Sequence, residues 1–174
     1  MYLLHNYYEN IIRHDSLNKF NHKNLLNLPK LKKIVLNFGF KKYNFKTLLS
    51  ALLALELITA QKPAITKSKL SNITLQIRKG DPIGCKITLR KKMMLYFLFK
   101  ILNELLPKTR KLPVNFKSKT KVHYAFKIEN ILAFGKLENN YKFFKNLKGL
   151  NICFVTNCSM NNYLKFLLKS YKII

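Results

Sequence analysis

Side chains that donate hydrogen bonds or carry positive charge alternate with apolar residues in three segments of the sequence. The sets are Lys33 and Asn37; Thr74, Gln76 and Arg78; and Lys86, Thr88 and Arg90. Ammonium, guanidinium, amide and hydroxyl groups held at regular spacing can position phosphates and ribose hydroxyls. An ordinary solvated sheet face would account for any one set alone. The hypothesis of an RNA-binding face therefore depends on all three sets occurring in one strongly cationic chain.

The net charge of the chain favours a polyanionic partner. Lys and Arg number 33 against 7 Asp and Glu, which gives a formal net charge of +26. Such a charge in a compact fold costs stability through self-repulsion, and a dense polyanion relieves it. RNA is the first candidate, and an anionic membrane surface is the second. Because nearly all the cations are lysines, which act as point charges, we expect binding to depend mainly on non-specific charge.

The same residues argue against an enzyme. The seven acids form no close pair in the sequence, and the four histidines lack metal-ligand spacing. No Gly-rich phosphate loop, nucleophile elbow or HExxH motif is present. Cys85, Cys153 and Cys158 include no CxxC pair, so we interpret them as buried thiols in a reducing compartment. We therefore expect no catalytic residue, no bound metal and no cofactor.

Length and composition predict one folded domain over residues 1–174. The chain is 48% hydrophobic and 13% aromatic, too apolar for disorder, and no linker or repeat divides it. No segment approaches the about 20 uncharged apolar residues of a membrane span. Glu9 and Asp15 argue against a signal or transit peptide. Abundant Lys, Asn, Ile and Phe are typical of an AT-rich gene, as organelle and endosymbiont genomes often have. If the protein works in an organelle, we expect it to be made there.

Helical spacing and period-two alternation predict the elements that carry these groups. We expect an N-terminal helix at about 3–13 and a final helix from a Ser159 cap to about Lys169. Between them we expect Leu-rich helices at 45–60 and 92–106, both buried all round. Pro107 ends the helix at 92–106. Strands are expected at 31–39, 73–78, 85–90, 122–128 and 150–156, the last a central strand covered on both faces. The fold class is α+β: a mostly antiparallel sheet with helices packed on one face and the other face polar and cationic.

Several of these segments resemble, in order and spacing, the universal large-subunit ribosomal protein L-five family, which binds 5S rRNA. They are LPKLKKIVLNFG at 28–39, ITAQKPAITKSKLS at 58–71, IRKGDPIGCKITLRKKMMLYFLFKILNELLP at 77–107 and GLNICFVTN at 149–157. The opening MYLLHNYYENIIRHDSLNKFNHKN resembles mitochondrially encoded members. The resemblance implies a structural constituent of the mitochondrial large ribosomal subunit, located in the matrix and encoded in the organelle genome.

The resemblance also implies where nucleic acid binds. Members grip 5S rRNA at the central protuberance, and the matching positions here are Asn37, Gln61, Lys62, Thr66, Lys67, Thr88 and Arg90, to which the alternation adds Lys33 and Lys86. The family's protruding loop, which reaches the peptidyl-site tRNA, matches Arg78, Lys79, Gly80, Asp81, Pro82 and Gly84. Residue types alone would make that loop a plain hairpin turn. The implied partners are 5S rRNA or its replacement, large-subunit rRNA, peptidyl-site tRNA and neighbouring large-subunit proteins.

Two features depart from the family pattern. A Gly- and Arg-rich loop is replaced by KTRKLPVNFKSKTK at 108–121, with six cations and no acid. We expect this divergent basic segment, within about 108–148, to be a reshaped rRNA contact or a surface for a lineage-specific protein. Lys91 stands where the family has a glycine, so an altered turn is expected there.

The competing hypothesis is a basic peripheral membrane-surface protein, which the cationic alternation on strands disfavours.

Overall fold

A computed structural model describes residues 2–20, 24, 27–40, 44–108, 123–147, 149–158 and 160–173. The chain divides into two units, each assembled from separate stretches. The first comprises Met1–Ile34, Leu89–Phe126 and Cys153–Ile174, and the second comprises Val35–Thr88 and Lys127–Ile152. The expectation of a single domain over residues 1–174 stays a prediction.

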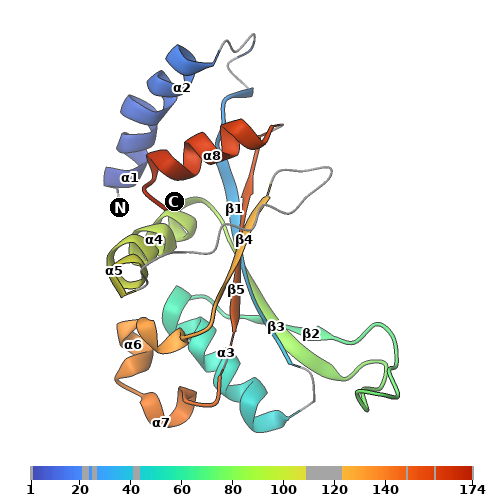
Figure 1. Cartoon of the computed structure of the whole chain (residues 1–174). Helices are drawn as coiled ribbons and strands as arrows, with labels where there is room; N and C mark the ends of the chain where they lie inside the picture. The colour runs from blue at the N-terminus through green and yellow to red at the C-terminus, as the bar shows by residue number, and fades with distance from the viewer. Residues whose placement is uncertain are drawn as a thin grey trace. The chain divides into compact units, whose positions relative to one another are not determined.

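Short alternating segments form a five-stranded sheet in the order β2-β3-β1-β5-β4. Its strands are β1 Leu31–Gly39, β2 Ala64–Lys67, β3 Pro82–Leu89, β4 His123–Ile128 and β5 Leu150–Thr156. Neighbouring strands are antiparallel. The Phe40 amide donates to the Ile83 carbonyl at 2.9 Å, which joins the end of β1 to the start of β3. The predicted α+β class with an antiparallel sheet is confirmed (Figure 1).

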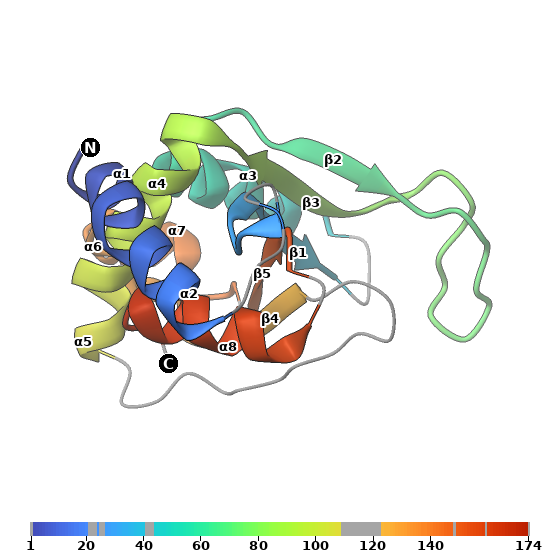
Figure 2. The ribbon, with the colours of Figure 1, turned by 90° about the horizontal axis from the view of Figure 1, so that it is seen from above.

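Helices cover one side of the strand segments within each unit (Figures 1 and 2). The first unit holds α1 Tyr2–Tyr7, η1 Tyr8–Ile12, α2 Arg13–Lys19, α4 Lys91–Lys100, η3 Ile101–Leu105, α5 Leu106–Lys108 and α8 Asn161–Ser170. The second holds α3 Phe45–Thr59, η4 Ile131–Ala133, α6 Gly135–Glu138 and α7 Tyr141–Phe144. Within the described ranges, none of these helices is both long and apolar enough to cross a membrane.

The helix-facing side of the strands is apolar, as the alternation predicted. In the second unit Leu36 and Phe38 of β1 are fully buried, and so are Ala54 and Leu55 of α3. In the first unit the rings of Tyr124, Phe126 and Phe154 pack with centroids 5.4–6.1 Å apart. Burying large aromatic side chains supplies much of the free energy that holds such a core together. The predicted strands at 31–39 and 85–90 are confirmed, as is the described part of 122–128.

The strand predicted at 73–78 is wrong. Ile73 is 94% exposed, and residues 73–76 form a turn between the bridged residues Asn72 and Ile77. The Asn72 side-chain oxygen accepts hydrogen bonds from the Thr74 hydroxyl (2.6 Å) and the Leu75 amide (3.4 Å). An Asn side chain that satisfies nearby backbone and hydroxyl groups in this way competes with a strand ladder. The strand that pairs with β3 is instead β2, which the sequence did not predict.

Helix boundaries differ from expectation at three places. The N-terminal helical segment continues past residue 13 to Lys19. The second long helix continues to Lys108, and a wide π turn (η3) precedes Pro107, whose ring would clash with a carbonyl one turn earlier in a regular helix. The final helix has Met160 at its N-cap position, while the predicted cap, Ser159, lies outside the described residues.

Three burial predictions are also wrong. The second long helix is not buried all round, because Phe99 is 47% exposed and Asn103 is exposed. The helix α3 is not buried all round, because its exposed face carries a stripe of apolar residues at four-residue spacing: Phe45, Leu49, Leu53 and Leu57. The strand β5 is central, but it is not covered on both sides, since Asn151 is exposed and Cys153 and Val155 are half-buried. Periodicity identifies an apolar face, whereas its burial depends on what else packs there.

Candidate nucleic-acid interface

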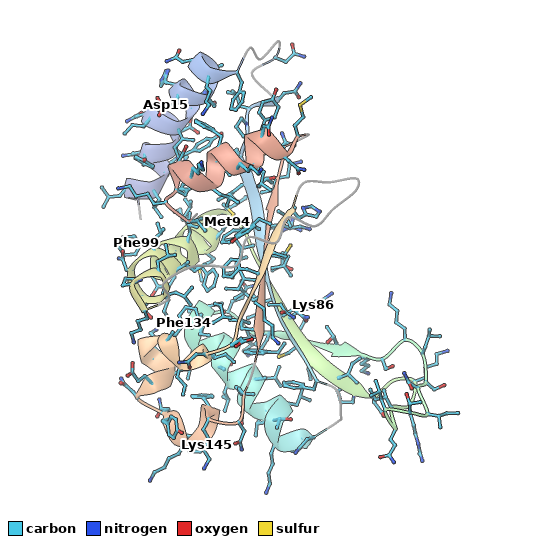
Figure 3. All side chains as sticks on the ribbon, in the orientation of Figure 1. Asp15, Lys86, Met94, Phe99, Phe134 and Lys145 are labelled. Atoms are coloured by element: carbon cyan, nitrogen blue, oxygen red, sulfur yellow. The ribbon has the colours of Figure 1, made fainter. Side chains whose placement is uncertain are left out.

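Among the elements that the structure describes, the helices of the second unit leave one side of its strands uncovered (Figures 1 and 2), and we call it the open side. Asn37 of β1 and Thr88 of β3 are half-buried there, and Lys86 of β3 is exposed. Figure 3 shows Lys86 on the side of β3 away from α3. The intervening residues Cys85 and Ile87 are buried on the helix side, so β3 separates a polar from an apolar face.

The edge strand β2 extends the open side. Its register places Thr66 opposite Gly84 and Ala64 opposite Lys86. A Cβ atom at Gly84 would overlap the Phe38 carbonyl oxygen and lie 2.9 Å from the Thr66 hydroxyl. Only glycine lets the three strands approach this closely at that point. Gly84 therefore acts within β3, and not as part of a loop as predicted.

Gln61 and Lys62 lie in the connection between α3 and β2, and both are exposed. The connection is fixed by the end of α3, where Ala60 adopts the left-handed region (φ 54°) and donates its amide to the Glu56 carbonyl at 2.7 Å. The Thr59 hydroxyl donates to the Leu55 carbonyl at 2.7 Å. Lys67 is exposed at the end of β2. The structure thus places Gln61, Lys62 and Lys67 on β2 or in the connection that leads into it.

In the first unit, the same strands continue with further polar positions. Lys33 is half-buried on β1, and Arg90 is exposed directly after β3. Cys153 of β5 is half-buried and not buried as predicted; burial raises the pKa of its thiol while the positive charge of Lys33 lowers it. Cys85 is buried in the second unit, where burial raises the pKa of its thiol to about 12. A thiol with such a pKa is protonated and inert at neutral pH.

The predicted bounds of the protruding loop, Arg78–Gly84, are only partly correct. The excursion between β2 and β3 runs from Ser68 to Asp81, while Pro82 and Gly84 belong to β3. Two backbone hydrogen bonds close its base: the Ser68 amide donates to the Asp81 carbonyl (2.8 Å), and the Gly80 amide donates to the Ser68 carbonyl (3.0 Å). Gly80 has φ 97°, a conformation that favours glycine.

Arg78 and Lys79 are exposed at this base. The Arg78 amide donates to the Asp81 carboxylate at 2.8 Å, which fixes the backbone and leaves the guanidinium outside the turn. Beyond the base, Leu70 (80% exposed) and Ile73 (94%) lie in solvent. The exposure of these two apolar residues was not predicted from the sequence, which placed Ile73 in a strand. Asn72 is a turn-forming residue that could have indicated the excursion.

Two further polar residues of the second unit's open side were not among the predicted RNA contacts. Asn151 of β5 and Lys127 of β4 are both exposed. Asn151 is the one polar residue between the buried Leu150 and Ile152, a signal that the apolar run at 150–156 obscured. The stem of Lys127 lies where a Cβ at Gly149 would be, and Gly149 has φ 77°.

No described group of three or more His, Cys, Asp or Glu side chains is placed to hold a metal ion. What the open side offers is a set of ammonium, amide and hydroxyl donors on strands. In the divergent basic segment, residues 109–122 lie outside the described ranges, so its predicted contacts stay predictions.

Comparisons with known proteins match both halves of the sequence. A family model described as "Ribosomal protein L5" matches residues 24–78, and a second model, which describes the C-terminus of the same ribosomal protein family, matches residues 82–174. The chain is 41% identical over 174 residues to "Large ribosomal subunit protein uL5m" of Reclinomonas americana, covering 98% of this chain and 96% of that protein.

Bacterial relatives are similar over most of their length. "Large ribosomal subunit protein uL5" of Clostridium acetobutylicum is 39% identical over 157 residues, covering 88% of this chain and 86% of that protein. The protein of the same name from Geotalea daltonii is 38% identical over 158 residues, covering 86% and 85%. These similarities extend well beyond the segments that carried the resemblance in the sequence.

Proposed function

Because this chain belongs to the ribosomal protein L5 family, whose members are structural and non-enzymatic components of the ribosome, we propose that it binds 5S rRNA or its equivalent at the central protuberance. Family membership confirms the predicted resemblance and the prediction that the protein is not an enzyme. Large-subunit rRNA and neighbouring large-subunit proteins are the further partners of this proposal.

The observation that carries the RNA-binding proposal is the row of donors on the second unit's open side. Asn37, Lys86 and Thr88 supply an amide, an ammonium and a hydroxyl from two adjacent strands. Such groups position ribose and phosphate, and a rigid strand holds them without the loss of side-chain freedom that a mobile loop would require. Lys33 and Arg90 of the first unit, together with Gln61, Lys62, Thr66 and Lys67 of the second, complete the proposed rRNA contacts.

The proposed compartment is the mitochondrial matrix, with the gene in the organelle. Two observations support it. The composition is that of an AT-rich gene, with 29 of the 33 cations being lysine once the four arginines are subtracted. The similarity to the relative named uL5m also covers nearly the whole chain.

The native thiol of Cys153 tests whether RNA lies along β5. Cys153 is half-buried on β5, whereas Cys85 and Cys158 are buried. We expect Cys153 to react first with a maleimide in the folded protein, and we expect saturating 5S rRNA to slow that reaction severalfold because the RNA would cover β5. The rate of labelling, followed by mass spectrometry of peptides, measures both effects.

The matched control is a cysteine at an exposed position of α6, Lys136→Cys. Its labelling should not change on addition of RNA, since α6 lies on the helix side of the second unit's strands (Figure 1). Equal protection of both thiols would indicate non-specific coating of a cationic protein. Unchanged labelling of Cys153 would contradict RNA binding along β5.

We further propose that the excursion between β2 and β3 contacts peptidyl-site tRNA through Arg78 and Lys79. Both side chains are exposed, so replacing them leaves the core intact. In ribosomes carrying Arg78→Ala with Lys79→Ala, we expect normal subunit assembly by sedimentation and about tenfold weaker peptidyl-site tRNA binding, the effect of losing two charged contacts. Lys136→Ala with Lys142→Ala removes the same charge from α6 and α7 and should leave tRNA binding unchanged. Equal tRNA binding by both ribosomes would refute the contact.

A further inference from the structure

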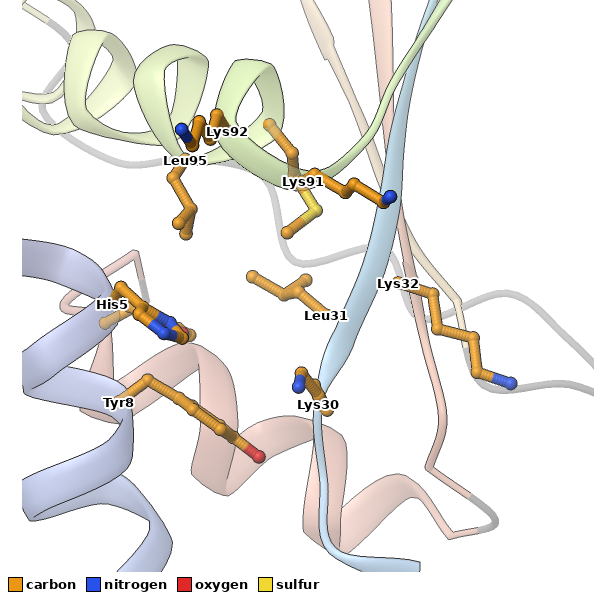
Figure 4. Close-up of a pocket in the computed structure, with 10 residues that line it drawn as sticks. His5, Tyr8, Lys30, Leu31, Lys32, Lys91, Lys92 and Leu95 are labelled. Atoms are coloured by element: carbon orange, nitrogen blue, oxygen red, sulfur yellow. The ribbon is translucent and has the colours of Figure 1, made fainter. Parts of the chain in front are cut away.

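The first unit contains a cavity of about 790 Å³ that the proposed RNA contacts do not use. Its walls come from α1 and η1, the start of β1, α4 and the turn after α8 (Figure 4). Figure 4 shows His5 of α1, Tyr8 of η1, Leu31 of β1 and Leu95 of α4 directed into this space. A cavity of this size holds a substantial ligand, such as several side chains of a peptide.

The floor of the cavity is apolar. Leu31 and Met94 are 5% and 7% exposed, and Leu95 is half-buried. The Tyr8 hydroxyl is already engaged, because it donates to the Pro29 carbonyl at 3.0 Å. Burial raises the pKa of Tyr8 to about 12 and also raises the pKa of Tyr171, so both phenols are neutral. The aliphatic side chains of Leu31 and Leu95 and the thioether of Met94 can accept other apolar side chains and adapt to their shape.

A second cavity of about 200 Å³ continues the apolar surface along α1 and α4. Leu95 lines both cavities. The second is otherwise lined by leucines of α1 and aromatic residues of α4, among which Leu3 is 76% exposed and Phe99 is 47% exposed. Because the two cavities share Leu95, we treat them as one docking surface, which we call the α1–α4 groove.

Positive charge borders the groove. Lys30, Lys91 and Lys92 line the larger cavity, and among the described residues that line either cavity none is acidic. The Lys30 ammonium lies 5.8 Å from the centre of the Tyr8 ring, so it is held at the mouth. Lys32 also borders the cavity, but Figure 4 shows its side chain directed away from it. An apolar floor with a cationic rim is complementary to a partner that carries apolar and acidic groups together.

The backbone at Lys91 is a separate observation. Lys91 has φ 48°, in the left-handed region that a non-glycine residue occupies only at a cost in backbone energy. Glycine would occupy the same position without strain. The chain therefore keeps a lysine at the edge of the cavity despite this cost.

The groove suits a protein segment better than RNA. An unstacked base needs an aromatic face to stack on and polar partners for its edge. In the larger cavity Tyr8 and Tyr171 are only 7% and 4% exposed and Lys30 overlies the Tyr8 ring, while Leu31, Met94 and Leu95 present no ring. A peptide can place apolar side chains in both cavities and carboxylates against the lysines, as amphipathic helices do in hydrophobic grooves.

We propose that the α1–α4 groove docks an acidic amphipathic segment of a protein partner. The segment places apolar side chains at Leu31, Met94 and Leu95 and carboxylates at Lys30, Lys91 and Lys92. This surface is distinct from the positions proposed for rRNA and tRNA, so its test is independent of theirs.

The first test measures binding of a fluorescein-labelled peptide of about 15 residues by fluorescence anisotropy, with Leu and Phe at helical spacing and Glu between them. The control peptide has the same composition in scrambled order, which keeps the charge and removes the apolar face. Because the protein is strongly cationic, any acidic peptide will bind weakly. We expect the ordered peptide to bind the full-length protein at least about tenfold more tightly than the scrambled one. Equal affinities would overturn the proposal.

Variants of the protein identify the groove as the binding site. Lys91→Gly removes the ammonium and relieves the strained backbone, so we expect an unchanged or higher melting temperature together with about threefold weaker peptide binding. Lys30→Glu with Lys92→Glu should weaken binding about tenfold or more and should allow a peptide with Lys in place of Glu to bind instead. Failure of this charge exchange, or full affinity in Lys91→Gly, would also overturn the proposal.

Crosslinking in the assembled ribosome tests the class of the partner. With p-benzoylphenylalanine in place of the exposed His5, we expect a crosslink to a protein segment that combines carboxylates and apolar residues. A crosslink to rRNA would overturn the assignment to a protein partner, and so would the absence of any crosslink.

Discussion

Alanine at Lys86, Thr88 and Arg90 together is expected to lower the affinity for 5S rRNA by about a hundredfold, because two charged contacts and one hydroxyl contact are lost. These are alternate positions on β3 and directly after it, and Lys86 and Arg90 are exposed, so the core is unaffected. Filter binding at fixed salt measures the change. The slope of log affinity against log salt should also become shallower by about two, one for each lost cation.

The control removes the same charge elsewhere. Lys136→Ala with Lys142→Ala deletes two exposed lysines from α6 and α7, on the helix side of the second unit. If binding depended only on net charge, both variants would lose affinity equally, and RNA binding through β3 would be refuted. A large loss in the β3 variant alone, with the fold preserved in circular dichroism, is the result we expect.

Gly84→Ala is expected to destabilise the protein by about 2–3 kcal/mol, at the upper end of the usual cost of overpacking. A Cβ at this position would overlap the Phe38 carbonyl oxygen, a backbone atom that cannot rotate aside, and it would also contact the Thr66 hydroxyl. The added methyl therefore has to separate β3 from β1 or from β2. Urea denaturation gives the free energy of unfolding. Displacement of β2 would also move Thr66 and Lys67, so weaker RNA binding should accompany the lost stability.

Gly135→Ala is the matched control, because a Cβ at Gly135 would have no atom within 4 Å and the residue lies in α6. Alanine stabilises helices relative to glycine, so this variant should be neutral or more stable by up to about 1 kcal/mol. A Gly84→Ala protein as stable as Gly135→Ala would show that the strands can separate without cost, contrary to the close approach described above.

Some elements follow from the sequence because their signal is local. In β1, Ile34, Leu36 and Phe38 alternate with more polar residues, and the strand period of two places them on one face whatever surrounds them. The same holds for Cys85, Ile87 and Leu89 in β3. The positions proposed to bind RNA on these strands could therefore be predicted from the sequence together with the family resemblance.

The same pattern failed at residues 73–78 because alternation does not specify a pairing partner. Strand formation there would require a neighbour for its backbone groups, and the Asn72 side chain forms a turn instead. At the sheet edge β3 pairs instead with the four-residue β2, which has too few residues to show a period. Pairing is decided across the fold, and loop closure between distant segments leaves no local signature.

Sequence alone determined the family, the fold class, the cationic character and the alternating faces of β1, β3 and β4, since each depends on residue identity or on spacing along a few residues. Tertiary structure alone decided that β2 pairs with β3, that Gly84 is a point of close strand approach and that one stripe of α3 remains uncovered. It also brought His5, Lys30 and Lys91 around one cavity. These features depend on contacts between residues far apart in the chain, and only folding determines which of those contacts form.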